Sequence, residues 1–237
     1  MLENAGLSEG RKYFTRSQLL TSWKAAGVLP FAFHNGQAWV LLGGELSWNG
    51  PGRRLFMWSD FGGQREAIDE DAAATASREC SEETLGMLYG SSSADQKSVQ
   101  QSSVALSDLL RQGDRACICT IHKLKKVKIF FNEPRPIITY HLTDLMQGCY
   151  HMFIVESLWV DPLMLALAVE QNSARPSPVP GAEKTSFAWV PLHELLSCIA
   201  RERRSYVLCC QQRVTARGCG LKGIDRRLVL RPCFAAR

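Results

Sequence analysis

The chain has 237 residues, 46% of them hydrophobic and 22% charged, and a formal net charge of +5. This composition is that of a globular protein and excludes disordered and fibrous chains, and the length allows one or two domains. The sequence has no apolar run of about 18 residues, so we expect no transmembrane helix and no membrane partner. Its N-terminus carries Glu3 and Glu9 and lacks an apolar segment, so we expect neither a secretory signal nor a transit peptide.

Secondary-structure signals alternate along the chain. Asn35-Gly36 predicts a hairpin turn between two apolar runs, and Gly86 can end a helix that Asp69 or Asp71 begins. We expect a loop over residues 43–54, strands over 28–33, 38–42, 55–58, 116–121, 127–131, 137–141, 150–155 and 187–190, and helices over 72–85, 161–171 and 193–199. Because strands and helices interleave, this order predicts an α/β layer fold.

Composition divides the chain into three parts. Residues 1–26 form a mixed, polar extension, and residues 27–200 carry the predicted elements, with an insertion loop at 91–107 that contains seven serines. Residues 201–237 hold ten Lys or Arg against two acids, a net charge of +8. This basic region is either a solvated cationic extension or a contact for polyphosphate or RNA, and its two apolar runs favour packing on the domain.

Cysteine usage indicates a reducing compartment. The nine cysteines are an odd number, no Cys-x-x-Cys occurs, and Cys209 and Cys210 are adjacent, which is a poor geometry for a disulfide. We therefore expect free thiols and a cytoplasmic location.

The segment from Gly62 to Gly86 is rich in carboxylates. At about 100° per helical residue, Glu83 lies roughly 40° from Glu79 and Glu82 roughly 60° to the other side, so three carboxylates share one arc. Clustered anions repel each other and need a cation. A hard divalent ion fits: Mg²⁺, with Mn²⁺ as an alternative, takes oxygen ligands, stabilises charge on a phosphoryl oxygen and helps to make a hydroxide nucleophile. An ordinary solvated acidic helix face would show the same spacing.

The same segment resembles the Nudix box, which reads Gly, five residues, Glu, seven residues, Arg-Glu, an apolar residue, any residue, Glu-Glu, any residue, Gly and an apolar residue. The positions that match without a shift are Glu70, Arg78, Glu79, Cys80, Glu82 and Glu83. Six residues rather than five separate Gly63 from Glu70, and Gly86 follows Glu83 after two residues rather than one. Either the loop after Gly63 is one residue longer, or Asp69 takes the acidic role.

The resemblance implies a fold and a reaction. The fold would be a Nudix-like α/β/α sandwich with a mixed β-sheet, covering roughly residues 27–199. The reaction would be Mg²⁺-dependent attack of water on the diphosphate linkage of a small nucleoside diphosphate derivative. The sequence leaves the substrate open among nucleotide sugars, dinucleotide coenzymes, ADP-ribose, damaged nucleotides, RNA caps and inositol pyrophosphates.

The resemblance also implies roles for the helix residues. Glu79 and Glu83 would be principal metal ligands, Glu82 would add a ligand or act as general base, and the Gly63 carbonyl would complete the metal sphere. Arg78 would orient the helix carboxylates.

Two acids outside the helix have implied roles as well. Glu70 would pair with Arg78. Many family members place a further Glu on a loop across the site, and Glu183 is the candidate here for a catalytic role, with Glu156 as the runner-up.

Two other functions are compatible with the resemblance. The first is a non-catalytic Nudix-fold module that binds a nucleotide or a partner, which the intact Glu79, Glu82 and Glu83 argue against. The second is a diphosphate isomerase, such as isopentenyl-diphosphate isomerase, which needs a catalytic cysteine in the substrate pocket. We expect Cys80 on the packing side of its helix, which disfavours an isomerase.

Overall fold

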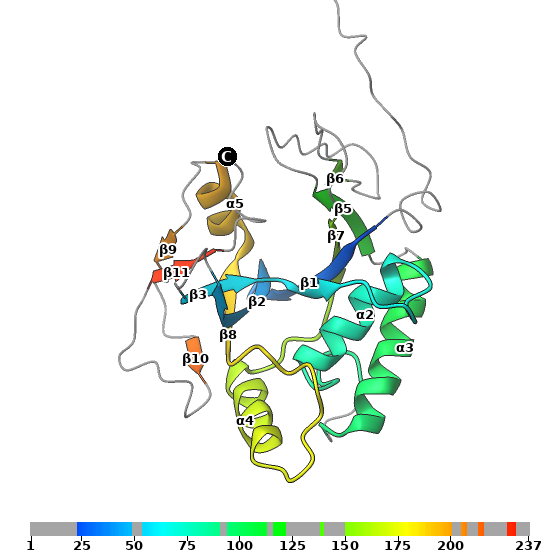
Figure 1. Ribbon diagram of the computed structural model, residues 1–237. Coiled ribbons are helices and arrows are strands. Elements are labelled where there is room, and N and C mark those ends of the chain that lie inside the picture. The colour runs from blue at the N-terminus through cyan, green and yellow to red at the C-terminus, as the bar shows by residue number, and fades with distance from the viewer. Residues whose placement is uncertain are drawn as a thin grey trace, which may run out of the picture.

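In the computed structural model, a mixed β-sheet has helices on both of its faces (Figure 1). The structure describes residues 23–48, 54–90, 94–112, 116–121, 138–139, 150–200, 205–207, 213–215 and 227–230. The strands are β1 (Ala25–His34), β2 (Gln37–Trp48), β3 (Arg54–Ser59), β4 (Phe61–Gln64), β5 (Ala116–Ile121), β6 (Ile138–Thr139), β7 (Tyr150–Glu156), β8 (Ser186–Pro191), β9 (Ser205–Val207), β10 (Arg213–Thr215) and β11 (Arg227–Val229). The helices are α2 (Ala72–Glu83), α3 (Gln96–Gln112), α4 (Pro162–Ser173) and α5 (Leu192–Ala200).

Strand β1 lies at the centre of the sheet. The strand order is β10-β8-β2-β1-β7-β5-β6, with β3 paired to β2 and β4 paired to β1. The β1–β7 and β5–β6 pairs are parallel and the other pairs are antiparallel, so the sheet is mixed as predicted. The predicted hairpin joins β1 to β2 through Asn35 and Gly36, whose φ angles of 51° and 74° are those that a tight two-residue turn requires.

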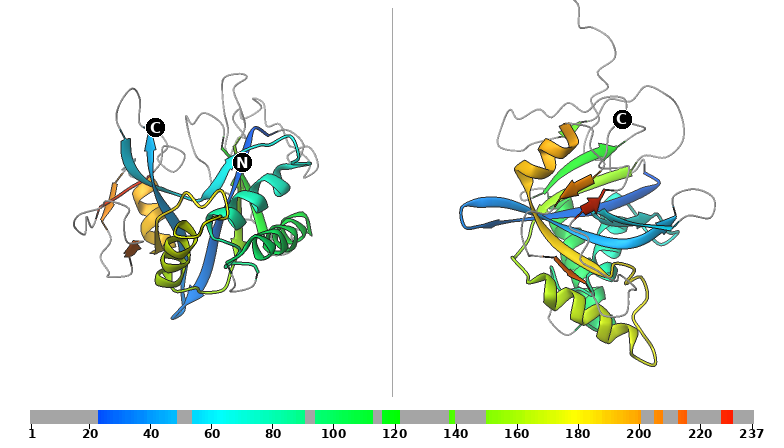
Figure 2. Two further views of the ribbon diagram at one scale, coloured as in Figure 1. Left: turned by 60° about the horizontal axis from the view of Figure 1, so that its bottom comes forward. Right: turned by 90° about the vertical axis from the view of Figure 1, so that its left-hand side faces the viewer.

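Each face of the sheet has its own hydrophobic core. On one face Val28 and Phe153 pack with Ala76 of α2, Leu106 of α3 and Leu165 of α4. On the other face Leu29, Val190 and Trp58 pack with Leu195 of α5 and with Leu230. Figure 2 shows α5 on the opposite side of the sheet from the other three helices. The predicted α/β/α sandwich is therefore confirmed.

Helix α2 carries the box carboxylates, and local signals define its ends. The Asp71 side chain accepts a hydrogen bond from the Ala74 backbone N–H at 2.8 Å and caps the first turn. Gly86 has φ +74° and donates its N–H to the Ser81 carbonyl at 2.7 Å, which ends the helix. A Cβ on Gly86 would lie 2.7 Å from the Ser98 carbonyl oxygen, so glycine also lets α3 approach closely.

The prediction of a serine-rich insertion loop at 91–107 is wrong for the described part of that segment, because α3 runs through it and packs on α2. Three of its serines are buried, Ser98, Ser102 and Ser107, and Ser102 accepts a hydrogen bond from Ser81 of α2 at 3.0 Å. Leu106 and Leu110 are 0% exposed on the same side. Small serines at this interface allow the two helices to approach closely. Because serine has a low hydropathy, the buried face of α3 does not show in the sequence as an apolar stripe.

Parts of residues 201–237 belong to the sheet and its second face. Strand β10 pairs with β8, β11 pairs with β9, and Leu230 bridges to Trp58 and is 1% exposed. Of the ten basic residues, Arg213 and Arg227 alone lie in these strands.

The predicted strand at 127–131 lies outside the described residues, and the one at 137–141 is represented by β6. None of the helices described here is both long and apolar enough to cross a membrane.

Strand β2 is longer than predicted. It continues to Trp48, so the residues from Gly43 onward that the sequence assigns to a loop pair instead with β3 and β8. The extension brings Gly43 and Glu45 to the end of the sheet where α2 and β4 lie.

Candidate active site

Glu79 lies directly against the backbone of β4. Gly63 pairs with Ala26 of β1, and a Cβ on Gly63 would lie 2.5 Å from the carboxylate atoms of Glu79. Glycine at this position is therefore what allows the carboxylate to rest on the strand. Burial raises the pKa of Glu79, Arg78 lowers it, and the charges of Glu82 and Glu183 raise it further.

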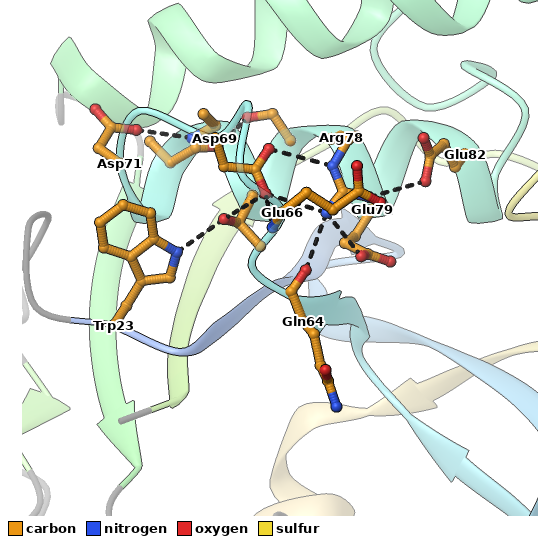
Figure 3. Close-up of polar contacts among 12 residues, drawn as sticks. Trp23, Gln64, Glu66, Asp69, Asp71, Arg78, Glu79 and Glu82 are labelled. Carbon is orange, nitrogen blue, oxygen red and sulfur yellow. Dashed lines mark hydrogen bonds and ion pairs between the residues drawn. The ribbon is translucent and has the colours of Figure 1, made fainter. Parts of the chain in front are cut away.

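Arg78 joins the carboxylates of α2 to the loop before the helix (Figure 3). Its guanidinium lies 3.0 Å from Glu79 Oε1 and 3.2 Å from Glu82 Oε2, and its side chain is 12% exposed. It also donates to the Gln64 carbonyl at 3.0 Å. Burial alone would lower the pKa of Arg78, but the surrounding carboxylates raise it, so the side chain remains charged. Arg78 therefore ties Glu79 and Glu82 to the backbone at Gln64.

On the loop, Arg78 pairs with Asp69 and Glu66 rather than with Glu70, and Asp69 is the buried partner. Asp69 accepts from Arg78 Nε at 3.2 Å and Nη2 at 3.1 Å, and its side chain is 3% exposed. Glu70 is 83% exposed and contacts Arg111 at 3.5 Å, so the predicted pairing of Glu70 with Arg78 is wrong. Asp69 keeps the five-residue spacing from Gly63, so the extra residue lies between the acid and the helix.

The Asp69 carboxylate accepts hydrogen bonds from several groups. Besides Arg78, the Glu66 N–H donates to Asp69 at 2.8 Å and the Thr75 hydroxyl at 3.0 Å. Burial raises the pKa of Asp69, but these hydrogen bonds and the Arg78 charge outweigh it, and the pKa lies below its ordinary value.

The loop before β8 closes over Glu82. Gly181 has φ +82°, and a Cβ there would lie 2.8 Å from Glu82 Oε2. Glu183, two residues on, is exposed and near enough for its charge to raise the pKa of Glu79. The runner-up Glu156 pairs with Phe31, which lies five residues, or roughly 17 Å, along β1 from Ala26, the residue that pairs with Gly63. The structure thus brings Glu183 to the candidate site and leaves Glu156 at the far end of the sheet.

Glu83 points into the protein, where it meets a lysine that the sequence reasoning missed. Lys184 is 0% exposed, and its Nζ lies 3.4 Å from Glu83 Oε1, 3.1 Å from Glu45 Oε1 and 2.8 Å from Ser59 Oγ. Glu83 Oε2 is buried and has no hydrogen-bond partner within the described residues. Burial raises the pKa of Glu83 to about 8, Lys184 lowers it, and Glu79 and Asp60 raise it.

Asp60 and Tyr150 line the same end of the sheet. The Tyr150 hydroxyl donates to Asp60 Oδ2 at 2.5 Å, and a Cβ on Gly27 or Gly62 would collide with that hydroxyl. Burial raises the pKa of Asp60 to about 6, against the opposing effects of Tyr150 and Lys184. Neither residue is predicted from the sequence, because both lie outside the box.

The donor chemistry of the site suits a hard cation, although the carboxylates do not converge in this arrangement. No three His, Cys, Asp or Glu side chains in the described ranges stand together as a metal-holding group. Arg78 holds Glu79 and Glu82, and Lys184 holds one oxygen of Glu83. Two features nevertheless fit a bound ion: the unpartnered buried Oε2 of Glu83, and the backbone that Gly63 leaves open beside Glu79.

Comparison with solved structures finds proteins of similar fold. The Nudix domain of Shewanella oneidensis NrtR, complexed with ADP-ribose, matches at 15% identity and a TM-score of 0.36, over 78% of this chain and 82% of that one. An Ap4A hydrolase of C. elegans matches at 15% identity and a TM-score of 0.30, over 74% and 84%. No protein-family model and no curated protein matches the sequence. At these identities and TM-scores the likeness says nothing of substrate or activity.

Proposed function

We propose that the chain is a Mg²⁺-dependent pyrophosphohydrolase of the Nudix type, which cleaves a diphosphate linkage in a small nucleoside diphosphate derivative. The observation that carries the proposal is the arrangement of Glu79 and Glu83 at one end of the sheet. One carboxylate lies on the backbone at Gly63, and the other keeps a buried oxygen without a partner among the described residues. Buried carboxylate oxygens with a purely structural role normally have hydrogen-bond partners. A buried oxygen without such a partner therefore favours the interpretation that it binds a ligand.

The proposed roles follow from these positions. Glu79, Glu82, the Gly63 carbonyl and Glu83 Oε2 would hold Mg²⁺, with Mn²⁺ as an alternative. The bound ion would stabilise charge on the phosphoryl oxygens and lower the pKa of a bound water. Glu82 would also serve as a base for that water.

Two positions flank these ligands. Glu183, on the loop that closes over the helix, would be a second catalytic carboxylate. Arg78, fixed by Asp69, would orient Glu79 and Glu82.

Two other functions predict different experimental or structural observations. A non-catalytic module would bind a nucleotide saturably and release no product. An isomerase would need an accessible cysteine, whereas Cys80 is 1% exposed in the core and burial raises the pKa of its thiol.

The test is a screen of the purified full chain with Mg²⁺ against ADP-ribose, diadenosine polyphosphates, nucleotide sugars and dinucleotide coenzymes. On the best substrate we expect Glu79→Gln to lower kcat by about 100-fold or more, because it removes charge stabilisation at the reacting phosphate. Glu156→Gln is the matched control and should leave kcat unchanged, since Glu156 lies at the other end of β7. Turnover in EDTA within twofold of turnover in Mg²⁺ would refute the proposal.

A further inference from the structure

Lys184 is a fully buried cation that the proposed reaction leaves without a role. Its aliphatic stem crosses β2 over Gly43, where a Cβ would lie 2.8 Å from Lys184 Cγ and 2.9 Å from Cδ. The next residue, Thr185, donates its N–H to the Gly44 carbonyl at 2.9 Å and ties the loop to the same strand. The close contact with Gly43 and the hydrogen bond from Thr185 to Gly44 therefore fix the position of the Lys184 ammonium.

The ammonium is satisfied by three oxygens. A lysine ammonium has three N–H donors, and Lys184 Nζ meets Ser59 Oγ at 2.8 Å, Glu45 Oε1 at 3.1 Å and Glu83 Oε1 at 3.4 Å. The side chains of Glu45 and Glu83 are 5% and 4% exposed, so bulk water does not screen the charges of these carboxylates. A positive charge between two buried carboxylates offsets their mutual repulsion.

The same three oxygens are a donor set for a hard metal ion. Two carboxylates and a hydroxyl around one point are the ligand types that Mg²⁺ and Mn²⁺ take. We call Glu45, Ser59 and Oε1 of Glu83 the inner oxygens. Glu83 thus has one oxygen on a cation inside the protein and its other oxygen, Oε2, without a partner in the described structure.

We propose that the Lys184 ammonium takes the place of a metal ion at the inner oxygens, so that Glu83 links this tethered cation to the divalent ion of the proposed active site. The outer ion rests on the proposed function, whereas the position of the ammonium does not. Two-metal sites place two positive centres beside the reacting phosphate. Here the second positive charge belongs to the chain and does not dissociate, and because its N–H groups are occupied by the inner oxygens it acts through Glu83 rather than on the phosphate.

The test counts bound Mn²⁺ in the full chain without substrate, by electron paramagnetic resonance of the free ion. Lys184→Met removes the ammonium but keeps the volume of its stem, and we expect it to bind one more Mn²⁺ per chain than the wild type. Glu45→Gln added to Lys184→Met should return the count to that of the wild type. Glu45→Gln alone should leave the count unchanged. Lys97→Met, at an exposed position of α3, is the matched control and should also leave it unchanged.

Two results would overturn the inference: an unchanged count in Lys184→Met, or the loss of an ion from Glu45→Gln alone. Melting curves address folding, because Lys184→Met leaves two buried carboxylates without their cation. We expect a lower Tm than that of the wild type in EDTA, and a larger rise in Tm on adding Mn²⁺. A variant that stays unfolded in Mn²⁺ would also contradict the inference, since the ion should replace the ammonium.

The two proposals fail separately. A wild type that hydrolyses none of the substrates refutes the proposed function, while the difference in Mn²⁺ count between Lys184→Met and the wild type still decides the role of Lys184.

Discussion

Neutralising Asp69 should destabilise the fold far more than neutralising Glu70 beside it. Asp69→Asn keeps the size of the side chain but removes the charge that faces Arg78 at 3.1 Å, between side chains 3% and 12% exposed. Removing one member of a buried pair costs about 3–5 kcal/mol, because the other charge is left uncompensated. Arg78 retains Glu66, Glu79 and Glu82, so we expect a cost at or just below the lower end of that range, about 2–3 kcal/mol.

The matched control is Glu70→Gln. It breaks a 3.5 Å contact with Arg111 between side chains 83% and 37% exposed, and such surface pairs contribute at most about 1 kcal/mol. The assay is equilibrium unfolding in urea, with the change in midpoint compared at constant slope. If Glu70→Gln costs as much as Asp69→Asn, the assignment of Asp69 as the partner of Arg78 is wrong.

The same pair predicts a pH dependence of stability. The pKa of Asp69 is lower in the folded chain than in the unfolded chain, so the unfolded chain takes up a proton first as the pH falls. The stabilisation is therefore complete above the ordinary pKa of an aspartate and is lost as the pH falls through the folded value. Urea unfolding at decreasing pH should show the difference between wild type and Asp69→Asn narrowing below pH of about 4.

Three further substitutions test other parts of the structure. Leu106→Ala should cost about 2–5 kcal/mol in urea unfolding because Leu106 is 0% exposed between α3 and α2, whereas Val104→Ala, at 65% exposure on the same helix, should cost less than about 0.5 kcal/mol. Leu230→Ala should cost a similar 2–5 kcal/mol if the C-terminal region is part of the core, and a change below about 0.5 kcal/mol would place that region outside it. Gly63→Ala should displace the Glu79 carboxylate and lower turnover on the best substrate, yet shift Tm little, because that carboxylate can move away; full turnover would contradict the position of Glu79.

Local signals predict the helix of the box well. Asp71 and Gly86 define its ends through short-range hydrogen bonds, and these depend on residue types at fixed offsets. The hairpin at Asn35-Gly36 has the same basis. The sequence does not predict helix α3, because its buried face uses Ser98 and Ser102, which are small and polar, and it is the contact with α2 that buries them.

Long-range contacts explain the other differences. Spacing alone cannot choose between Asp69 and Glu70, because the path of the loop decides which of two adjacent acids faces Arg78. Lys184 follows Glu183, the residue that the resemblance singled out, and successive side chains of an extended chain point to opposite sides. One of the two therefore stays at the surface while the other enters the core, where it meets Glu83, a hundred residues away in the sequence.

The order of strands in the sheet has a consequence for synthesis of the chain. The hairpin of β1 and β2 is made first, but its neighbours in the sheet are β7 and β8, and β8 ends about 140 residues after β2. At about 5–20 residues per second, the edge of β2 that β8 covers stays open for roughly 7–30 s, and the edge of β1 that β7 covers stays open for roughly 5–20 s. Open edges pair readily with other chains. The soluble yield on expression is therefore governed by how often nascent chains meet during that interval, and slower initiation or a lower temperature should raise it without any change in the stability of the folded protein.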